Sequence, residues 1–169
     1  MNLYILRHAI AVERDPLGME DDSKRELTSK GAAKMRRIAT GMLAMGLQFD
    51  LILSSPYLRT RQTADIVADV FDVRERLRFT ENLTPGTGAE KVIEEVLKHY
   101  KKKENILLVG HEPMLSTMIS ILISGEPTLP ITMKKAGLCC LTIPVLSYGR
   151  CAVLEWLLQP SQLAKLEKG

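Results

Sequence analysis

Short apolar runs alternate with amphipathic segments along most of this chain, and this alternation constrains the fold more than any other feature. The apolar runs at 2–6, 51–53 and 106–109 are short enough for buried strands, and each precedes a segment with helical spacing of apolar residues. Strands that alternate with helices predict a mostly parallel sheet covered by helices on both faces. We therefore expect an α/β protein, a three-layer α/β/α sandwich.

Residues with strong positional preferences mark the ends of the expected helices. Thr28 is a good N-cap for the first long helix, and Gly46 is placed to end it. Ser55 and Pro56 suit the N-cap and the first turn of the next helix, which follows the second strand. The second helix is therefore expected to open directly at the carboxyl end of its strand.

The second half of the chain continues the same pattern. We expect a strand and turn at 78–88, helices at 89–100 and 114–124, and strands at 138–143 and 151–157. The last two strands are joined by a turn, so they are expected to be antiparallel edge strands. Without an internal repeat or a linker, residues 1–169 are expected to form a single domain.

Composition and charge exclude several classes of protein. Of the 169 residues, 46% are apolar and 25% are charged, which argues against disordered, collagen-like and coiled-coil chains. The net charge of +3 is too small and too evenly spread to indicate nucleic acid or an anionic membrane as a partner. The apolar stretch at 114–123 is too short to span a bilayer, and Arg7 interrupts the only candidate for a signal peptide. We therefore expect a cytoplasmic protein. A monomer needs no further assumption and is the expected oligomeric state.

The three cysteines lack the spacing of a disulfide framework or a zinc site. Cys139 and Cys140 are adjacent and are expected to point to opposite faces of a strand. We interpret them and Cys151 as free thiols in a reducing compartment. The acidic loop at 13–26 lacks the spacing of a calcium loop, so neither a metal nor another cofactor is expected.

Three polar clusters follow strands of the expected sheet. Arg7 and His8 come after the first strand, Arg59 follows the second, and His111 follows the strand at 106–109. Ligands bind at the carboxyl ends of parallel strands, so these side chains are expected to share one small site. The last two clusters also lie at expected helix N-termini, where free N–H groups favour an anion. The sequence therefore predicts a phosphate-sized pocket.

These residue types suit phosphoryl transfer. An arginine guanidinium stays cationic and offers a planar fork of donors that fits phosphoryl oxygens. A histidine with one neutral ring nitrogen can attack phosphorus and form a covalent phosphohistidine. We expect His8 to be this nucleophile, with its other ring nitrogen donating to a backbone carbonyl. Arg7, Arg59 and His111 are expected to hold the phosphoryl group.

The same clusters resemble the motifs of a known family. Leu6-Arg7-His8-Ala9 is similar to the Arg-His-Gly signature of the histidine phosphatase, or phosphoglycerate mutase-like, superfamily. The runs at 54–64 and 109–113 resemble its second motif and its second-histidine motif. The SixA-type phosphohistidine phosphatases of that superfamily are similar at 25–28, 83–85 and 157–160. The resemblance covers nearly the whole chain and implies a phosphoglycerate mutase-like fold, His8 as nucleophile, a pocket of Arg7, Arg59 and His111, and no metal.

Two positions depart from the family pattern. Ala9 stands where the signature has Gly, and a small residue is expected to fit there. Larger members use a carboxylate as general acid; Asn82 takes that place here, and Glu81 is one residue away, on the other face of an expected strand. Imidazole leaves far more easily than an alkoxide, so a site without a placed acid suits phosphohistidine better than a sugar phosphate.

The expected activity is therefore removal of phosphate from a phosphohistidine-bearing protein, which the short chain leaves room to approach. Two alternatives stay open. One is a small-molecule phosphomonoesterase that uses Glu81 or another acid, and the other is a non-catalytic phosphate-binding module, to which only Ala9 points. Arg25 is a candidate substrate-binding residue, although an ion pair with Asp21 and Asp22 would explain it equally well.

Overall fold

A six-stranded sheet lies at the centre of the structure, a computed structural model that describes residues 1–17 and 21–166. Its strands are β1 (Asn2–Arg7), β2 (Leu51–Ser54), β3 (Leu77–Phe79), β4 (Asn105–Gly110), β5 (Leu138–Thr142) and β6 (Val153–Leu158). They lie in the order β3-β2-β4-β1-β5-β6; β1 to β4 are parallel, and β5 and β6 are antiparallel to their neighbours. The expected mostly parallel sheet is confirmed.

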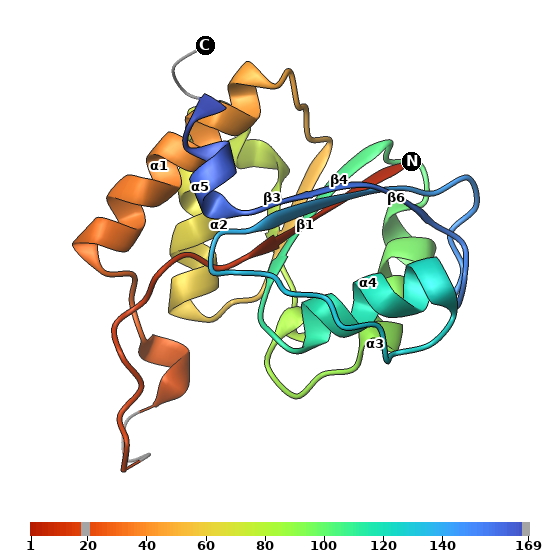
Figure 1. Cartoon of the computed structure of the whole chain (residues 1–169), viewed down its shortest axis with the longest axis horizontal. Coiled ribbons are helices and arrows are strands. Elements are labelled where there is room, and N and C mark those ends of the chain that lie inside the picture. The colour runs from red at the N-terminus through yellow and green to blue at the C-terminus, as the bar shows by residue number, and fades with distance from the viewer. Residues whose placement is uncertain (18–20, 167–169) are drawn as a thin grey trace.

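Helices cover both faces of this sheet, which confirms the three-layer architecture (Figure 1). One face carries α1 (Ser29–Ala44), α2 (Leu58–Val70) and the short α5 (Pro160–Leu163). The other face carries α3 (Ala89–Glu95), which continues into a π-helical turn at Val96–Tyr100, and α4 (Met114–Ser124). Among the described residues no helix is both long and apolar enough to cross a membrane.

Successive residues of the central strands enter opposite layers of the core. In β1, Tyr4 packs on the side of α1 and α2, whereas Ile5 packs on the side of α3 and α4. Cys140 and Cys139 of β5 divide in the same way, and both are free thiols, as is Cys151. Because these strands are buried on both faces, their sequences are apolar throughout instead of alternating.

The predicted ends of two helices are confirmed. The hydroxyl oxygen of Thr28 accepts the backbone N–H of Gly31 at 2.9 Å, which caps α1, and Gly46 follows the helix at a φ of 74°. Gly125 caps α4 in the left-handed conformation, at a φ of 89°. An L-residue with a side chain adopts this conformation only at a cost, so glycine at these positions ends the helix.

Three local predictions are wrong. Helix α2 begins at Leu58, because Ser55 and Pro56 form a turn ahead of it and the Ser55 hydroxyl accepts the Tyr57 N–H at 3.3 Å. The segment Glu81–Leu83 is a 3₁₀ turn and not a strand, since the Thr80 hydroxyl accepts an N–H from within it. Finally, β6 lies at the edge of the sheet, but β5 lies inside it, between β1 and β6.

Candidate active site

The carboxyl ends of β1, β4 and β2 meet at one edge of the sheet. Arg7 is paired in register with Gly110, and Ser54 with Val109, so the residues that follow these strands emerge side by side. The His8 N–H donates to the Gly110 carbonyl at 3.1 Å. The ring centroids of His8 and His111 are 5.3 Å apart, and both rings are buried. The parallel register therefore brings the two histidines together.

The protonation of His8 follows from its hydrogen bond. Its Nδ1 lies 2.7 Å from the Ala9 carbonyl oxygen, which can only accept, so Nδ1 carries the proton and Nε2 keeps its lone pair. Burial lowers the pKa of His8 to about 4. This value includes the effects of the Arg59, Arg7 and Lys135 cations, which lower the pKa, and of the Ala9 carbonyl, which raises it. The ring is therefore neutral at pH 7.

A serine hydroxyl orients the second histidine. The Nε2 of His111 lies 3.0 Å from the Ser55 hydroxyl oxygen. That oxygen also accepts the Tyr57 N–H, and we assign the hydroxyl proton to the contact with Nε2, which places the His111 proton on Nδ1. Burial, followed by the Arg59 and His8 charges, lowers the pKa of His111 to about 3. A neutral ring with a donating Nδ1 results.

The segment 131–137 holds Arg7 and passes beside His8. Arg7 Nη1 donates to the Met133 carbonyl at 2.7 Å, and the Ala136 N–H donates to the His8 carbonyl at 3.0 Å. Lys135 on the same segment adds a cation close to His8. Sequence analysis missed this segment because it has no periodic pattern; the adjacent Lys134 and Lys135 are its only local signal.

Asp22 holds Arg59 through two hydrogen bonds. Its Nη1 donates to the Asp22 carbonyl at 2.7 Å, and its Nη2 donates to Asp22 Oδ2 at 2.8 Å. The other carboxylate oxygen, Oδ1, lies 2.9 Å from Arg25 Nε. The predicted partners of Arg25 were Asp21 and Asp22, and the ion pair in the structure is with Asp22. Asp21 instead caps the 3₁₀ turn Asp22–Lys24.

Several buried nitrogens around His8 lack a partner within the described part of the chain. Arg7 Nε, Arg59 Nε and His111 Nδ1 form no hydrogen bond there. Buried polar atoms are nearly always paired, so three unpaired nitrogens from three elements call for an explanation. An anion with several acceptor oxygens would satisfy all three. The described ranges contain no group of three or more His, Cys, Asp or Glu side chains that could hold a metal ion.

The residues at the expected acid position face elsewhere. Asn82 Nδ2 donates to Glu95 Oε2 at 2.7 Å, and the Thr80 hydroxyl donates to the same oxygen at 2.6 Å. These three residues line a polar hollow that contains neither His8 nor His111. The Glu81 side chain is exposed. The expected contrast between two faces of a strand does not apply, because both residues lie in a 3₁₀ turn.

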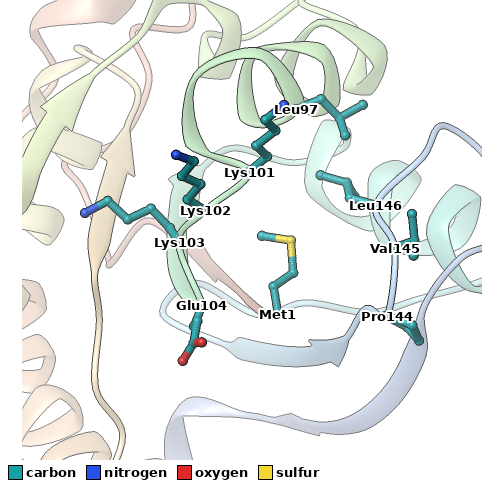
Figure 2. A pocket seen from close by; sticks show the side chains of 9 residues that line it. All are labelled: Met1, Leu97, Lys101, Lys102, Lys103, Glu104, Pro144, Val145 and Leu146. Carbon is teal, nitrogen blue, oxygen red and sulfur yellow. The ribbon is translucent and has the colours of Figure 1, made fainter.

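Another hollow lies at the opposite end of the parallel strands (Figure 2). Met1 and Glu104, which immediately precede β1 and β4, lie beside Lys101 and Val145 in its wall. It therefore belongs to the amino ends of the parallel strands, whereas the two histidines follow the carboxyl ends. This hollow is not part of the site described above.

Comparisons with known proteins agree with this architecture. Residues 3–84 match the family model of the histidine phosphatase superfamily (branch 1). An uncharacterized protein of Picosynechococcus sp. is 32% identical over 140 residues, which are 82% of each chain. The phosphohistidine phosphatase SixA homolog of Haemophilus influenzae is 30% identical over 131 residues, 71% of this chain and 76% of that one.

A solved structure shares the fold across the whole length. The protein histidine phosphatase SixA in complex with tungstate superimposes with a TM-score of 0.82, over 96% of this chain and 99% of that chain, at 22% identity. This likeness shows the phosphoglycerate mutase-like fold that the resemblance implied. Together with the sequence relatives and the family model, it identifies the chain as a member of the histidine phosphatase superfamily, the metal-independent phosphatases that use a histidine nucleophile.

Proposed function

We propose that this protein is a phosphohistidine phosphatase that removes the phosphoryl group from a histidine-phosphorylated phosphotransfer domain of another protein. His8 is the nucleophile, and Arg7, Arg59 and His111 hold the phosphoryl oxygens. The neutral ring of His8 and the three unpaired nitrogens around it support these roles. The name of the relative from Haemophilus influenzae, a phosphohistidine phosphatase SixA homolog, points to the same activity.

In the first step, His8 Nε2 attacks phosphorus. A bond forms between Nε2 and phosphorus, and the bond between phosphorus and the substrate imidazole breaks. The departing electron pair stays on the substrate nitrogen, and the ring leaves as neutral imidazole if its other nitrogen already carries a proton. The guanidinium groups and His111 Nδ1–H donate to the equatorial oxygens, where charge is concentrated in the transition state.

In the second step, water attacks the phosphorus of phosphorylated His8. A phosphorus–oxygen bond forms, the bond to Nε2 breaks, and inorganic phosphate leaves. The Ala9 carbonyl accepts a hydrogen bond from Nδ1–H in both steps, so it stabilises the positive charge that the ring carries while it is phosphorylated. His8 then returns to its neutral form.

The observation that carries the substrate class is the contact between Asn82 and Glu95. The position that an acid takes in larger relatives holds an amide, and this amide donates to Glu95 instead of facing the histidines. The carboxylate beside Arg59 is Asp22, whose pKa lies below its ordinary value, so it holds no proton near neutral pH. A leaving group that needs no proton fits this arrangement.

The test of the substrate class compares kcat/KM for a phosphohistidine-bearing phosphotransfer domain with kcat/KM for small phosphate monoesters. We expect the phosphoprotein to be preferred by at least about 100-fold, because an alkoxide leaving without general-acid assistance costs roughly that factor. Efficient ester turnover with an intact phosphohistidine domain would favour a small-molecule phosphomonoesterase instead.

A further inference from the structure

Asp22 joins the 3₁₀ turn Asp22–Lys24 to helix α2 across 37 residues of sequence. Its carboxylate oxygen Oδ2 accepts a hydrogen bond from Arg59 Nη2, its other oxygen Oδ1 forms an ion pair with Arg25 at 2.9 Å, and its backbone carbonyl accepts a bond from Arg59 Nη1. Arg14 Nε lies 3.8 Å from the same Oδ1. One residue therefore sets the positions of two guanidinium groups and approaches a third.

The pairing leaves part of Arg59 unused. A guanidinium has five N–H donors in a fixed plane, and Asp22 accepts one from each Nη nitrogen. Nε is buried without a hydrogen-bond partner in the described part of the chain. Since the group is planar, fixing the two Nη nitrogens also fixes the direction of Nε–H. The contact with Asp22 thus orients Arg59 and leaves three of its five N–H groups for other acceptors.

We propose that Asp22 is a positioning residue for phosphoryl transfer, which holds Arg59 so that its remaining N–H groups meet the phosphoryl oxygens, while its other carboxylate oxygen pairs with Arg25. This inference rests on the proposed function, in which Arg59 binds the phosphoryl group. Asp22 acts through them and does not touch the reacting atoms.

The charges of the three groups support this role. Only 4% of the Arg59 side chain is exposed, and burial lowers the pKa of its guanidinium while the Asp22 carboxylate raises it. Burial likewise works against ionisation of Asp22, but Arg59, Arg25 and Arg14 outweigh it and hold the pKa of the carboxyl below its ordinary value. Asp22 and Arg59 each favour the charged form of the other, and the Asp22 carboxylate opposes the effect of Arg25, whose charge lowers the pKa of Arg59.

The direct test is the affinity of tungstate, an oxyanion with four oxygens around its centre, for wild type and for Asp22→Asn, by calorimetry. An asparagine has one oxygen and an NH₂ group, so it can accept from one arginine but not from both. We expect tungstate affinity to fall by about 10- to 100-fold, the usual effect of losing a charge-assisted hydrogen bond. KM for the phosphoprotein should rise in parallel. Tighter binding of tungstate by Asp22→Asn would mean that Asp22 competes with the anion. An unchanged affinity would mean that Asp22 does not position Arg59 for the anion. Either result overturns the proposal.

Asp21→Asn is the matched control. It removes the same charge one residue earlier, and asparagine still accepts the Ser23 N–H that Asp21 accepts at 3.0 Å. We expect tungstate affinity of this variant to match that of wild type. Asp22→Glu keeps both oxygens and should recover part of the affinity, a rescue that general damage to the loop would not show. Failure of wild type to act on phosphohistidine would overturn the proposed function, while the tungstate comparison would still decide the role of Asp22.

Discussion

The Nδ1 atom of His8 lies 2.7 Å from the carbonyl oxygen of Ala9, the next residue in the chain. This short contact fixes which ring nitrogen carries the proton and leaves Nε2 as the nucleophile of the proposed mechanism. Ala9 is itself held, because its N–H donates to the Thr63 hydroxyl oxygen at 3.0 Å. The Thr63 hydroxyl in turn donates to the Arg59 carbonyl at 2.6 Å. The nucleophile and an arginine of the site are thus tied through one threonine.

Thr63→Val should therefore lower kcat with little loss of folding. Valine keeps the shape but leaves the Ala9 N–H unpaired, which frees the carbonyl that orients His8. We expect kcat for the phosphoprotein to fall by about 10-fold, the effect of losing one neutral hydrogen bond. Thr40→Val is the control, since Thr40 makes the same bond to a carbonyl one turn earlier, at Arg36, on a different helix. Equal activity of the two variants would contradict the role of Thr63.

Ser55→Ala should impair the second histidine. Without the hydroxyl, His111 Nε2 loses its partner at 3.0 Å, and the proton can move between the two ring nitrogens. We expect kcat/KM to fall by about 10- to 100-fold, less than for loss of a complete oxyanion donor. Ser54→Ala is the matched control, because the Ser54 hydroxyl donates to the Ser55 carbonyl and not to the histidine. Steady-state kinetics of the pair would show whether the Ser55 contact matters.

The buried histidines should make the protein less stable in mild acid. Their pKa values are lowered from 6.5 to about 4 for His8 and about 3 for His111, so below pH 6.5 the unfolded chain takes up protons that the folded chain does not. The free energy of unfolding should then fall by about 1.4 kcal/mol per pH unit for each histidine between pH 6.5 and 4. Urea unfolding at several pH values measures this slope. His8→Asn should reduce the slope by the contribution of one histidine, about 1.4 kcal/mol per pH unit. A slope that is the same in the variant would show that His8 is not buried as a neutral ring.

Glu81→Gln should leave the rate unchanged. The Glu81 side chain is exposed, and the proposed leaving group needs no acid from this position. Phosphoprotein turnover should stay within about two-fold of wild type, as expected for a surface substitution away from the site. Loss of ester or phosphoprotein turnover in this variant would revive the phosphomonoesterase alternative.

The sequence was most informative where the structure depends on neighbouring residues. The cap at Thr28 and the bounds of α4 follow from local preferences and a regular apolar pattern. The alternation of strands and helices likewise predicts that Arg7, His8 and His111 follow strand ends, since a parallel sheet places those ends together. These features could be read from the chain because each depends on short-range rules.

Contacts between distant segments could not be predicted in this way. Ser55 fits the pattern of a helix cap, but its hydroxyl contacts His111, 56 residues later, and the helix begins further on. The Met133 carbonyl holds Arg7 from a segment without any periodicity. Asp22 could be recognised as a partner of Arg25, but its two bonds to Arg59 depend on the contact between the turn Asp22–Lys24 and α2.

The most direct test of the account is phosphate release from a phosphohistidine-bearing phosphotransfer protein in the presence of EDTA, compared between wild type and His8→Ala. We predict that wild type dephosphorylates the protein and that His8→Ala is slower by about 10⁴-fold or more, the order of loss when a catalytic nucleophile is removed. Turnover by wild type that His8→Ala retains would contradict the nucleophile, and an intact phosphoprotein after incubation with wild type would contradict the proposed function.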